Sequence, residues 1–432
     1  MPYDSNVHSF SFSPLRCIYR VPKRLRQGND DEAYTPQVVS IGPLHHGKEH
    51  LNGMEYHKER YLKGFLSRTT KTLGVFKKKL QDQEVNLRSC YAEPIGYSSE
   101  EFLRIILVDA AFIIEFLLRG NYPEFRDEGD HIFSRPWMYG DVLVDLQVLE
   151  NQLPLFILED LFVADKCFDS TNKPSIIRLS HAVFNTTFFW KERKYVLFEG
   201  DFFSEVKHFV DLIRTLCVPS KLNPDEGVTE LYMAGFKSIS TPSITELHRA
   251  GVKSISTPSI TELHRAGVKL KAGSTNNLFD IQLADGRLEI PRLQINDHTE
   301  VLIRNLVAFE QCHYLKERYI SDFVFLMDYF VNTPKDVELL VKHGIVENWL
   351  GDNSEVSTLI NKLGKGVGIN DKDFYFAAVA DDLDIHCRTR WNKWMANLRQ
   401  NYLNTPWTII SFVAAFFLLI LTFIQTVCTI IS

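Results

Sequence analysis

Residues 100–119, EEFLRIILVDAAFIIEFLLR, decide the fold of this 432-residue chain more than any other stretch. Their apolar side chains recur at i, i+3 and i+4, which is the spacing of a helix buried against other elements. We therefore expect a core helix here, within a mainly helical body. The same periodicity predicts further helices at residues 53–79, 138–164, 176–191, 202–217, 299–331, 334–349, 354–363 and 373–402.

The composition supports a folded body and excludes several classes of protein. Hydrophobic residues make up 45% of the chain and aromatic residues 12%, enough for a large buried core. The net charge of −6 leaves no basic footprint for nucleic acid. The seven cysteines never occur as Cys-x-x-Cys, which argues against a zinc ribbon or a secreted disulfide scaffold. The N-terminus lacks the pattern of a signal peptide, so we expect the body to stay in the cytosol.

The C-terminal stretch, residues 407–431, contains no Asp, Glu, Lys or Arg. At 1.5 Å per residue this length exceeds the roughly 30 Å of a hydrocarbon core, so it predicts one transmembrane helix over residues 406–431. A buried helix of a soluble protein is the alternative. Basic residues precede the span and only Ser432 follows it, which predicts a tail-anchored, single-pass protein whose body faces the cytosol. The membrane-flanking residues are Arg388, Arg390, Lys393, Arg399 and the interfacial Trp407.

A tandem duplication lies in the middle of the chain. Residues 237–252 and 253–268 are identical copies of KSISTPSITELHRAGV. In the second copy Ser259 and Glu262 have capping-box spacing, and Gly267 can close a helix of about two turns. Two copies are too few for a solenoid, so we interpret the extra copy as a tolerated loop insertion rather than a functional array.

A small β-hairpin follows the duplication. Residues 279–283 alternate between apolar and polar, Asp285 and Gly286 suit a type I′ turn, and Pro291 ends the pairing. Residues 268–270 are a candidate third strand. The expected organisation is an N-terminal tail (1–17), a body (18–402) that contains a helical lobe (53–217), a repeat-containing linker (219–275), the hairpin (278–291) and a second helical lobe (299–402), and the membrane helix (406–431).

Several segments in order resemble the signature of one plant family. They are residues 18–22, 25–26, 33–36, 39–47, 54–55, 58, 61–62, 145–156, 261–263, 266–269, 288–291, 304–311 and 406–407. Through these motifs the chain resembles the family called domain of unknown function 247, a family of uncharacterised plant membrane proteins. The resemblance implies no established activity, and the link of some grass members to pollen self-recognition favours a recognition role. The chain departs from the family in its duplicated segment, where one copy is expected.

A histidine-rich turn is the strongest candidate for metal chemistry. Residues 46–50, HGKEH, fit the H-x-x-E-H pattern of inverted zincins, in which two histidines on one helical face hold zinc. Pro43, Gly47 and Gly53 disfavour a helix here, so hydrogen bonding within a turn is the competing interpretation. The candidate ligands are His45, His46 and His50.

A polar trio within an apolar stretch is the second candidate. Glu150, Asn151 and Gln152 precede Pro154, which would remove a backbone hydrogen bond from the helix expected at 138–164. Because buried polar groups must be paired, we expect these side chains to satisfy backbone groups freed at a kink, in preference to binding a ligand. Possible partners are Arg304, Asn305, Glu310 and Gln311.

The sequence as a whole favours a non-enzymatic, tail-anchored recognition or scaffold protein without a cofactor. Its expected partners are a lipid bilayer, at the plasma membrane or an endomembrane, and a protein that the sequence does not identify. The alternative is a membrane-tethered metal-dependent enzyme that uses the turn at His45–His50. A third interpretation, an outward-facing ectodomain, depends on the glycosylation sequon at Asn185.

Overall fold

The computed structural model describes residues 13–26, 30–168, 173–184, 206–218, 258–275, 277–369, 373–388 and 406–431. The chain forms two compact units, which interleave along the sequence. Unit 1 comprises residues 1–237, 296–321 and 362–369, and unit 2 comprises the remainder. The first repeat copy, Asn185, Arg390, Lys393 and Arg399 lie outside the described residues.

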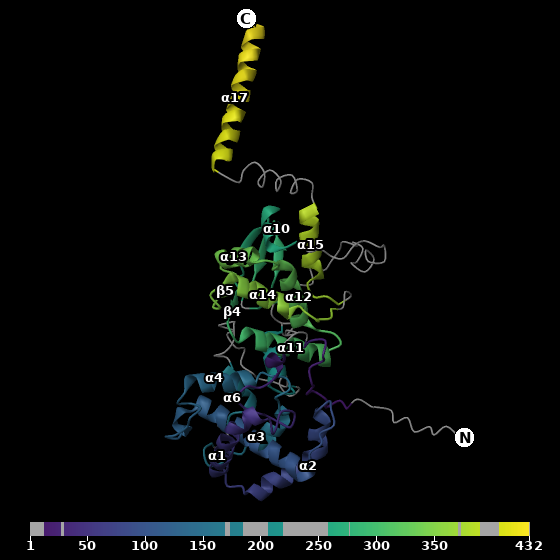
Figure 1. The fold of residues 1–432 in the computed structure, drawn as a ribbon, viewed down its shortest axis with the longest axis vertical. Helices are drawn as coiled ribbons and strands as arrows, with labels where there is room; N and C mark the ends of the chain where they lie inside the picture. The colour runs from purple at the N-terminus through teal and green to yellow at the C-terminus, as the bar shows by residue number, and fades with distance from the viewer. Residues whose placement is uncertain are drawn as a thin grey trace, which may run out of the picture. The chain divides into compact units, whose positions relative to one another are not determined.

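Unit 1 is built around the expected core helix, α3 (Ser99–Asn121). Seventeen of its residues are buried, and it packs against α1 (Glu55–Ser67), α2 (Leu73–Cys90) and α6 (Ile176–Phe184) (Figure 1). It also contacts α5 (Leu155–Leu161). A capping box of Ser98 and Glu101 begins the helix. The mainly helical class predicted from the sequence is thus confirmed.

Further elements complete unit 1. They are η1 (Asp30–Tyr34), η2 (Glu49–Met54), η3 (Pro123–Phe125), α4 (Pro136–Asp145), α7 (Phe209–Cys217) and α11 (Thr299–His313). Sequence periodicity assigned α11 to a second helical lobe, whereas the structure groups it with unit 1. The grouping follows from tertiary contacts, since α11 packs on α7 and η1, and sequence periodicity does not report such contacts.

Three of the long helices expected from periodicity are each broken in two. The stretch 53–79 ends at Ser67 and resumes in α2, 138–164 divides into α4 and α5, and 299–331 divides into α11 and α12 (Tyr319–Phe330). Polar side chains intervene at the first break, where Asp165 accepts the Thr70 N–H at 2.8 Å. A side chain that binds a backbone N–H competes with the helix for that group, and the spacing of apolar residues does not reveal this competition.

The break within 138–164 corrects the expected kink. Residues 146–154 are not helical, and Pro154 is the N-cap residue of α5 instead of a kink inside one helix. A proline suits this position because a helix start leaves backbone N–H groups unpaired in any case.

Unit 2 contains two small sheets. The first has the order β1-β3-β2, in which β2 (Gln282–Ala284) and β3 (Arg287–Ile290) are antiparallel, and β1 (Lys269–Ala272) is parallel to β3. Asp285 and Gly286 have φ of 51° and 70°, as a type I′ turn requires. The predicted hairpin and third strand are confirmed. The second sheet, β4 (Leu293–Ile295) with β5 (Val346–Asn348), replaces the end of the helix expected at 334–349.

Ahead of its C-terminal helix, the described part of unit 2 contains five further helices, of which α10 and α13 begin with capping boxes. They are α10 (Ile260–Arg265), α12, α13 (Pro334–Lys342), α14 (Asn353–Leu363) and α15 (Ala377–Arg388). The capping box of Ser259 and Glu262 forms as predicted, and Gly267 has the positive φ, 96°, of a helix-closing residue. Asp336 accepts the Thr261 N–H at 2.8 Å, which ties α10 to α13.

Deletion of residues 253–268 is expected to leave the fold intact. Because the two copies are identical, removal of either one yields the same chain, and the remaining copy supplies α10 directly before β1. Loop shortening changes closure entropy by only about 0.6 kcal/mol per halving. Circular dichroism and thermal unfolding of the deletion variant should match those of the full chain. A cooperative loss of helical signal would contradict the insertion interpretation.

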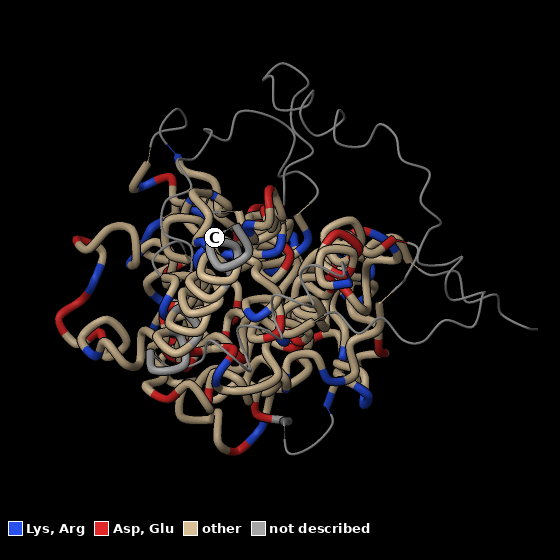
Figure 2. Tube along the Cα trace, turned by 90° about the horizontal axis from the view of Figure 1, so that it is seen from above, with Lys and Arg blue, Asp and Glu red and all other residues tan. Residues whose placement is uncertain are grey.

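The last element, α17 (Pro406–Ile431), is a helix without charged side chains, and the described part of its tube is tan in Figure 2. Its side chains are described only at residues 410–411, 414–422 and 424–426. Among the residues described in this way, no helix meets the length and apolar content needed to cross a membrane.

Candidate functional site

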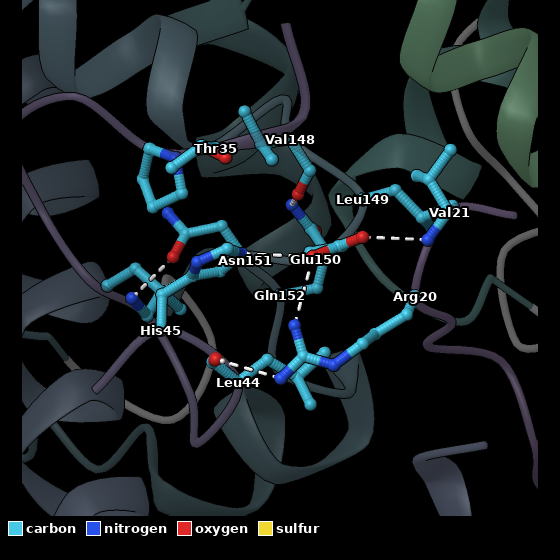
Figure 3. Close-up of polar contacts among 12 residues, drawn as sticks. Arg20, Val21, Thr35, Leu44, His45, Val148, Leu149, Glu150, Asn151 and Gln152 are labelled. Atoms are coloured by element: carbon cyan, nitrogen blue, oxygen red, sulfur yellow. Dashed lines mark hydrogen bonds and ion pairs between the residues drawn. The ribbon is translucent and has the colours of Figure 1, made fainter. Parts of the chain in front are cut away.

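The site centres on Glu150, a buried carboxylate in unit 1 (Figure 3). Its Oε1 accepts the Val21 N–H at 2.7 Å and pairs with Arg26. Its Oε2 lies 3.4 Å from Arg20 Nη1 and 3.2 Å from His45 Nε2. Burial raises the pKa of Glu150, but the contacts with His45, Val21 and Arg26 outweigh it, so the net pKa is below the usual value. Glu150 is therefore an anion that fastens the N-terminal segment.

Asn151 is buried, and its side-chain amide forms its hydrogen bonds with backbone groups. Its Oδ1 accepts the Ile41 N–H at 2.7 Å, and its Nδ2 donates to the carbonyls of Val39 and Asp145, both at 3.0 Å. One side chain thus joins the extended segment 39–41 to the end of α4. The bonds to the Ile41 N–H and the Val39 carbonyl replace backbone pairing that segment 39–41 does not make within a helix or sheet.

Gln152 performs a similar role toward α7. Its Nε2 donates to the carbonyls of Leu146 and Val148 at 2.7 and 2.8 Å, and its Oε1 accepts the Phe209 N–H at 3.1 Å. The first bond satisfies the Leu146 carbonyl where α4 ends, the second adds a donor to the Val148 carbonyl, which also accepts the Asn151 N–H at 3.0 Å, and the third satisfies an N–H at the start of α7.

Of the four partners suggested from sequence, Asn305 meets the segment 146–154. Its Oδ1 accepts the Leu149 N–H at 2.8 Å and its Nδ2 donates to the Ala33 carbonyl at 2.7 Å. The other three have different contacts: Arg304 pairs with Glu300, Glu310 with Arg214, and Gln311 with Arg24 and Gly368.

Two buried aspartates that the sequence analysis missed complete the site. Asp145 accepts the N–H groups of Gln37, Val38 and Val39 at 2.7–2.8 Å, while burial raises its pKa to about 6. Asp109, on α3, accepts the Gly42 N–H at 2.7 Å. The available signal was an acid within the apolar pattern of residues 100–119.

Asp109 also forms a buried ion pair. Its Oδ1 lies 2.6 Å from Lys58 Nζ, which contacts Glu55 at the same distance. Burial raises the pKa of Asp109 and the Lys58 charge lowers it. The effect of burial is the larger, so the net pKa lies above the usual value. Gly42, which Asp109 holds, has a φ of 73°, and a Cβ there would lie 2.8 Å from the Gln152 carbonyl oxygen. The glycine is required by both conformation and space.

The three candidate metal ligands have different surroundings. His45 contacts Glu150, the His46 ring lies edge-on to Tyr97 at 5.9 Å, and His50 Nε2 lies 3.3 Å from the Pro36 carbonyl oxygen. The stretch Glu49–Met54 is a 3₁₀ helix, so the H-x-x-E-H residues do not share one α-helical face. Within the described ranges no group of three or more His, Cys, Asp or Glu is arranged to hold a metal.

A groove of about 540 Å³ lies beside His46. Its ionisable lining includes four acids and one arginine, and Tyr56 and Tyr97 supply aromatic surface. The acids are Glu55, Glu59, Glu101 and Asp109, and Arg104 Nη2 lies 3.0 Å from Glu59 Oε1.

The membrane-flanking set is described only in part. Arg388 is the last residue of α15 and pairs with Asp384 at 2.8 Å. Trp407 lies in α17, and its side chain is outside the described residues.

His208, the N-cap residue of α7, is a buried histidine that the sequence analysis did not single out. Its Nε2 lies 3.0 Å from the Cys17 carbonyl oxygen, and its Nδ1 accepts the Asp211 N–H at 3.3 Å. Since a carbonyl only accepts, the neutral ring carries its proton on Nε2. Burial lowers the pKa of His208 to about 4.

Acidification is expected to destabilise the protein through His208. A depressed pKa means that the stabilisation is complete above the usual value of 6.5 and is lost as the pH falls toward about 4. Between pH 7 and pH 4 the wild type should lose about 3 kcal/mol more unfolding free energy than His208→Gln. Urea unfolding at several pH values measures this difference. Parallel pH profiles for the two proteins would contradict it.

Comparison with known proteins gives consistent matches over nearly the whole chain. A family model described as a plant protein of unknown function, DUF247, matches residues 18–421. The Arabidopsis thaliana UPF0481 protein At3g47200 is 28% identical over 96% of this chain and 86% of its own length. A second UPF0481 protein of that plant, At3g02645, is 24% identical over 94% of this chain and 89% of its own length. No solved structure matches the chain.

Proposed function

The chain belongs to the plant DUF247 family, and on that premise we propose that it is a non-enzymatic recognition or scaffold protein held at a membrane by α17. The helical body binds another protein, and the C-terminal helix tethers it to the bilayer. The body lies on the cytosolic side of the plasma membrane or an endomembrane.

The observation that carries the proposal is the exposed apolar surface of α17. Its described large apolar side chains are all exposed, up to 70% for Leu419. They are Ile410, Phe416, Phe417, Leu418, Leu419, Ile420, Leu421 and Ile424. Removing each from water is worth about 1.5–3 kcal/mol, so a hydrocarbon environment for this helix is strongly favoured.

The polar residues of α17 also suit a bilayer. Thr422 donates its hydroxyl to the Leu418 carbonyl and Thr426 donates to the Thr422 carbonyl, both at 2.8 Å. These hydroxyls are satisfied within the helix, as an apolar solvent requires. The basic residues Arg388, Arg390, Lys393 and Arg399 precede the span, which supports the cytosolic orientation.

The polar cluster of unit 1 supports a scaffold rather than a reaction centre. The side-chain amides of Asn151 and Gln152 are hydrogen-bonded to backbone groups. Glu150 accepts the Val21 N–H and forms ion pairs with two arginines. Side chains committed in this way hold loops in place, so that the surface built on them keeps one shape for a partner.

Partner capture with two forms of the protein tests the proposal. The full chain in detergent and a chain lacking residues 406–432 should recover the same protein partner, because recognition belongs to the body. Loss of that partner upon truncation, in detergent, would move recognition into the helix. Bound zinc in stoichiometric amount that disappears in His46→Ala would instead support the enzyme alternative.

A further inference from the structure

Two cysteines meet where the N-terminal segment crosses the end of α2. Cys17 and Cys90 are each only 2% exposed. The N–H groups of Cys17 and Ile18 both donate to the Cys90 carbonyl at 2.9 Å, and Ile18 forms a parallel β-bridge with Tyr91. The residues that precede a parallel bridge lie opposite each other, which places Cys17 beside Cys90. The Cys90 thiol itself donates to the Asn86 carbonyl at 3.3 Å.

The surroundings make the two thiols unequal. The contact with Cys17 lowers the pKa of Cys90, and the Lys207 charge acts in the same direction while burial opposes it. The same contact and burial raise the pKa of Cys17, which Asp211 raises further and Lys207 lowers. Cys90 is therefore the thiol that ionises first. Cys17 is the adjacent thiol that can then react with it.

We propose that Cys17 and Cys90 form a reversible oxidation site, at which a hydroperoxide such as hydrogen peroxide couples them into a disulfide. The inference concerns the body and rests on the proposed function in one respect, the cytosolic location of that body. Since the cytosol keeps thiols reduced, the disulfide forms only when peroxide rises and is a regulatory bond rather than a permanent one.

The reaction balances in two steps. The Cys90 thiolate attacks one peroxide oxygen and the O–O bond breaks, which leaves Cys90 sulfenic acid and a hydroxide that takes a proton to become water. Cys17 then attacks the Cys90 sulfur as it loses its proton, and hydroxide leaves as the second water. Two thiols lose two electrons and two hydrogens, and peroxide is reduced to two waters. A dithiol reverses the step while its own thiols are oxidised.

Peroxide reaches the pair through a local opening. The segment that carries Cys17 runs along the surface, since Leu15 is 40% exposed and Arg20 is exposed. Besides the two bonds to the Cys90 carbonyl, the Ala92 N–H donates to the Ile18 carbonyl at 2.8 Å, and His208 Nε2 lies 3.0 Å from the Cys17 carbonyl oxygen. Separation of this short bridge is a far smaller event than unfolding of α2. Once formed, the disulfide would fasten residues 13–20 to the end of α2.

Peptide mapping of the full-length protein tests the proposal. Reduced protein in detergent is treated with hydrogen peroxide, alkylated, digested and analysed by mass spectrometry. We expect a Cys17–Cys90 cross-linked peptide that is about 2 Da lighter than the sum of its thiol forms and that dithiothreitol separates. Cys167→Ser, which removes a half-buried cysteine outside the pair, should retain the cross-link.

Single variants test the order of the steps. In Cys17→Ser, a dimedone probe should trap sulfenic acid on Cys90, whereas in Cys90→Ser the Cys17 thiol should remain unmodified. The proposal is overturned if peroxide oxidises Cys167 in the wild type while Cys17 and Cys90 remain thiols, or if the cross-link forms only after denaturation. Both results come from the wild-type protein, so they do not depend on how the variants fold.

Discussion

A chain that ends at Thr405 is expected to be soluble, whereas the full-length protein is expected in the membrane fraction. The truncation removes α17, whose described large apolar side chains are exposed and whose sequence contains no charge from residue 407 to 431. No other stretch of the chain offers such a charge-free length to a bilayer. Carbonate extraction should release the truncated chain and leave the full chain in the pellet.

A point-variant form of the same test keeps the chain length constant. Leu418→Arg with Leu419→Arg should also shift the protein to the soluble fraction, because each charge at mid-span costs about 2.5–3.5 kcal/mol on an insertion scale. Leu418→Val with Leu419→Val is the matched control and should stay in the pellet. Persistence of the truncated chain in the pellet would reveal a second attachment and refute the tail-anchor topology.

Replacement of Asn151 by Leu is expected to give the largest loss of stability among single substitutions in the site. It removes the side-chain partners of the Ile41 N–H and the Val39 carbonyl in a buried setting, and one of the two donors to the Asp145 carbonyl, which keeps the Val148 N–H at 3.2 Å. Each of the two unsatisfied buried groups costs about 1–3 kcal/mol, so the unfolding free energy should fall by about 2–5 kcal/mol. Urea unfolding of the full chain in detergent measures the change.

Two control variants separate this effect from a general response to mutation. Asn86→Leu makes the same chemical change at an exposed position of α2, and His50→Ala removes an exposed histidine. Both should change the unfolding free energy by no more than about 0.5 kcal/mol. If Asn151→Leu unfolds at the same urea concentration as these controls, Asn151 has no structural role.

The sequence by itself determined the elements whose causes lie within a few residues. The periodicity of residues 100–119 predicted α3, the Ser259 and Glu262 spacing predicted α10, and Asp285-Gly286 predicted the hairpin. Such signals are readable because capping bonds, turn dihedrals and the sidedness of a helix arise between near neighbours.

Sequence reasoning also identified part of the site. It singled out Glu150, Asn151 and Gln152 as buried polar residues, because an apolar stretch cannot hold them unpaired. It named Asn305 among their partners without evidence of contact, and the structure supplies that contact through the Leu149 N–H. It did not find Asp109 or Asp145, whose roles are visible only with the segment 37–42 in place.

Only the tertiary structure decided where the expected helix 138–164 breaks and what holds it open. Asn151 takes the carbonyl of Asp145 nearby, but its oxygen accepts the N–H of Ile41, 110 residues earlier in the chain. The same holds for Cys17 and Cys90, which a β-bridge of one residue pair brings together. Contacts of this kind depend on how all the helices pack, since the free energy that closes a long loop comes from the whole core and not from the residues at its ends.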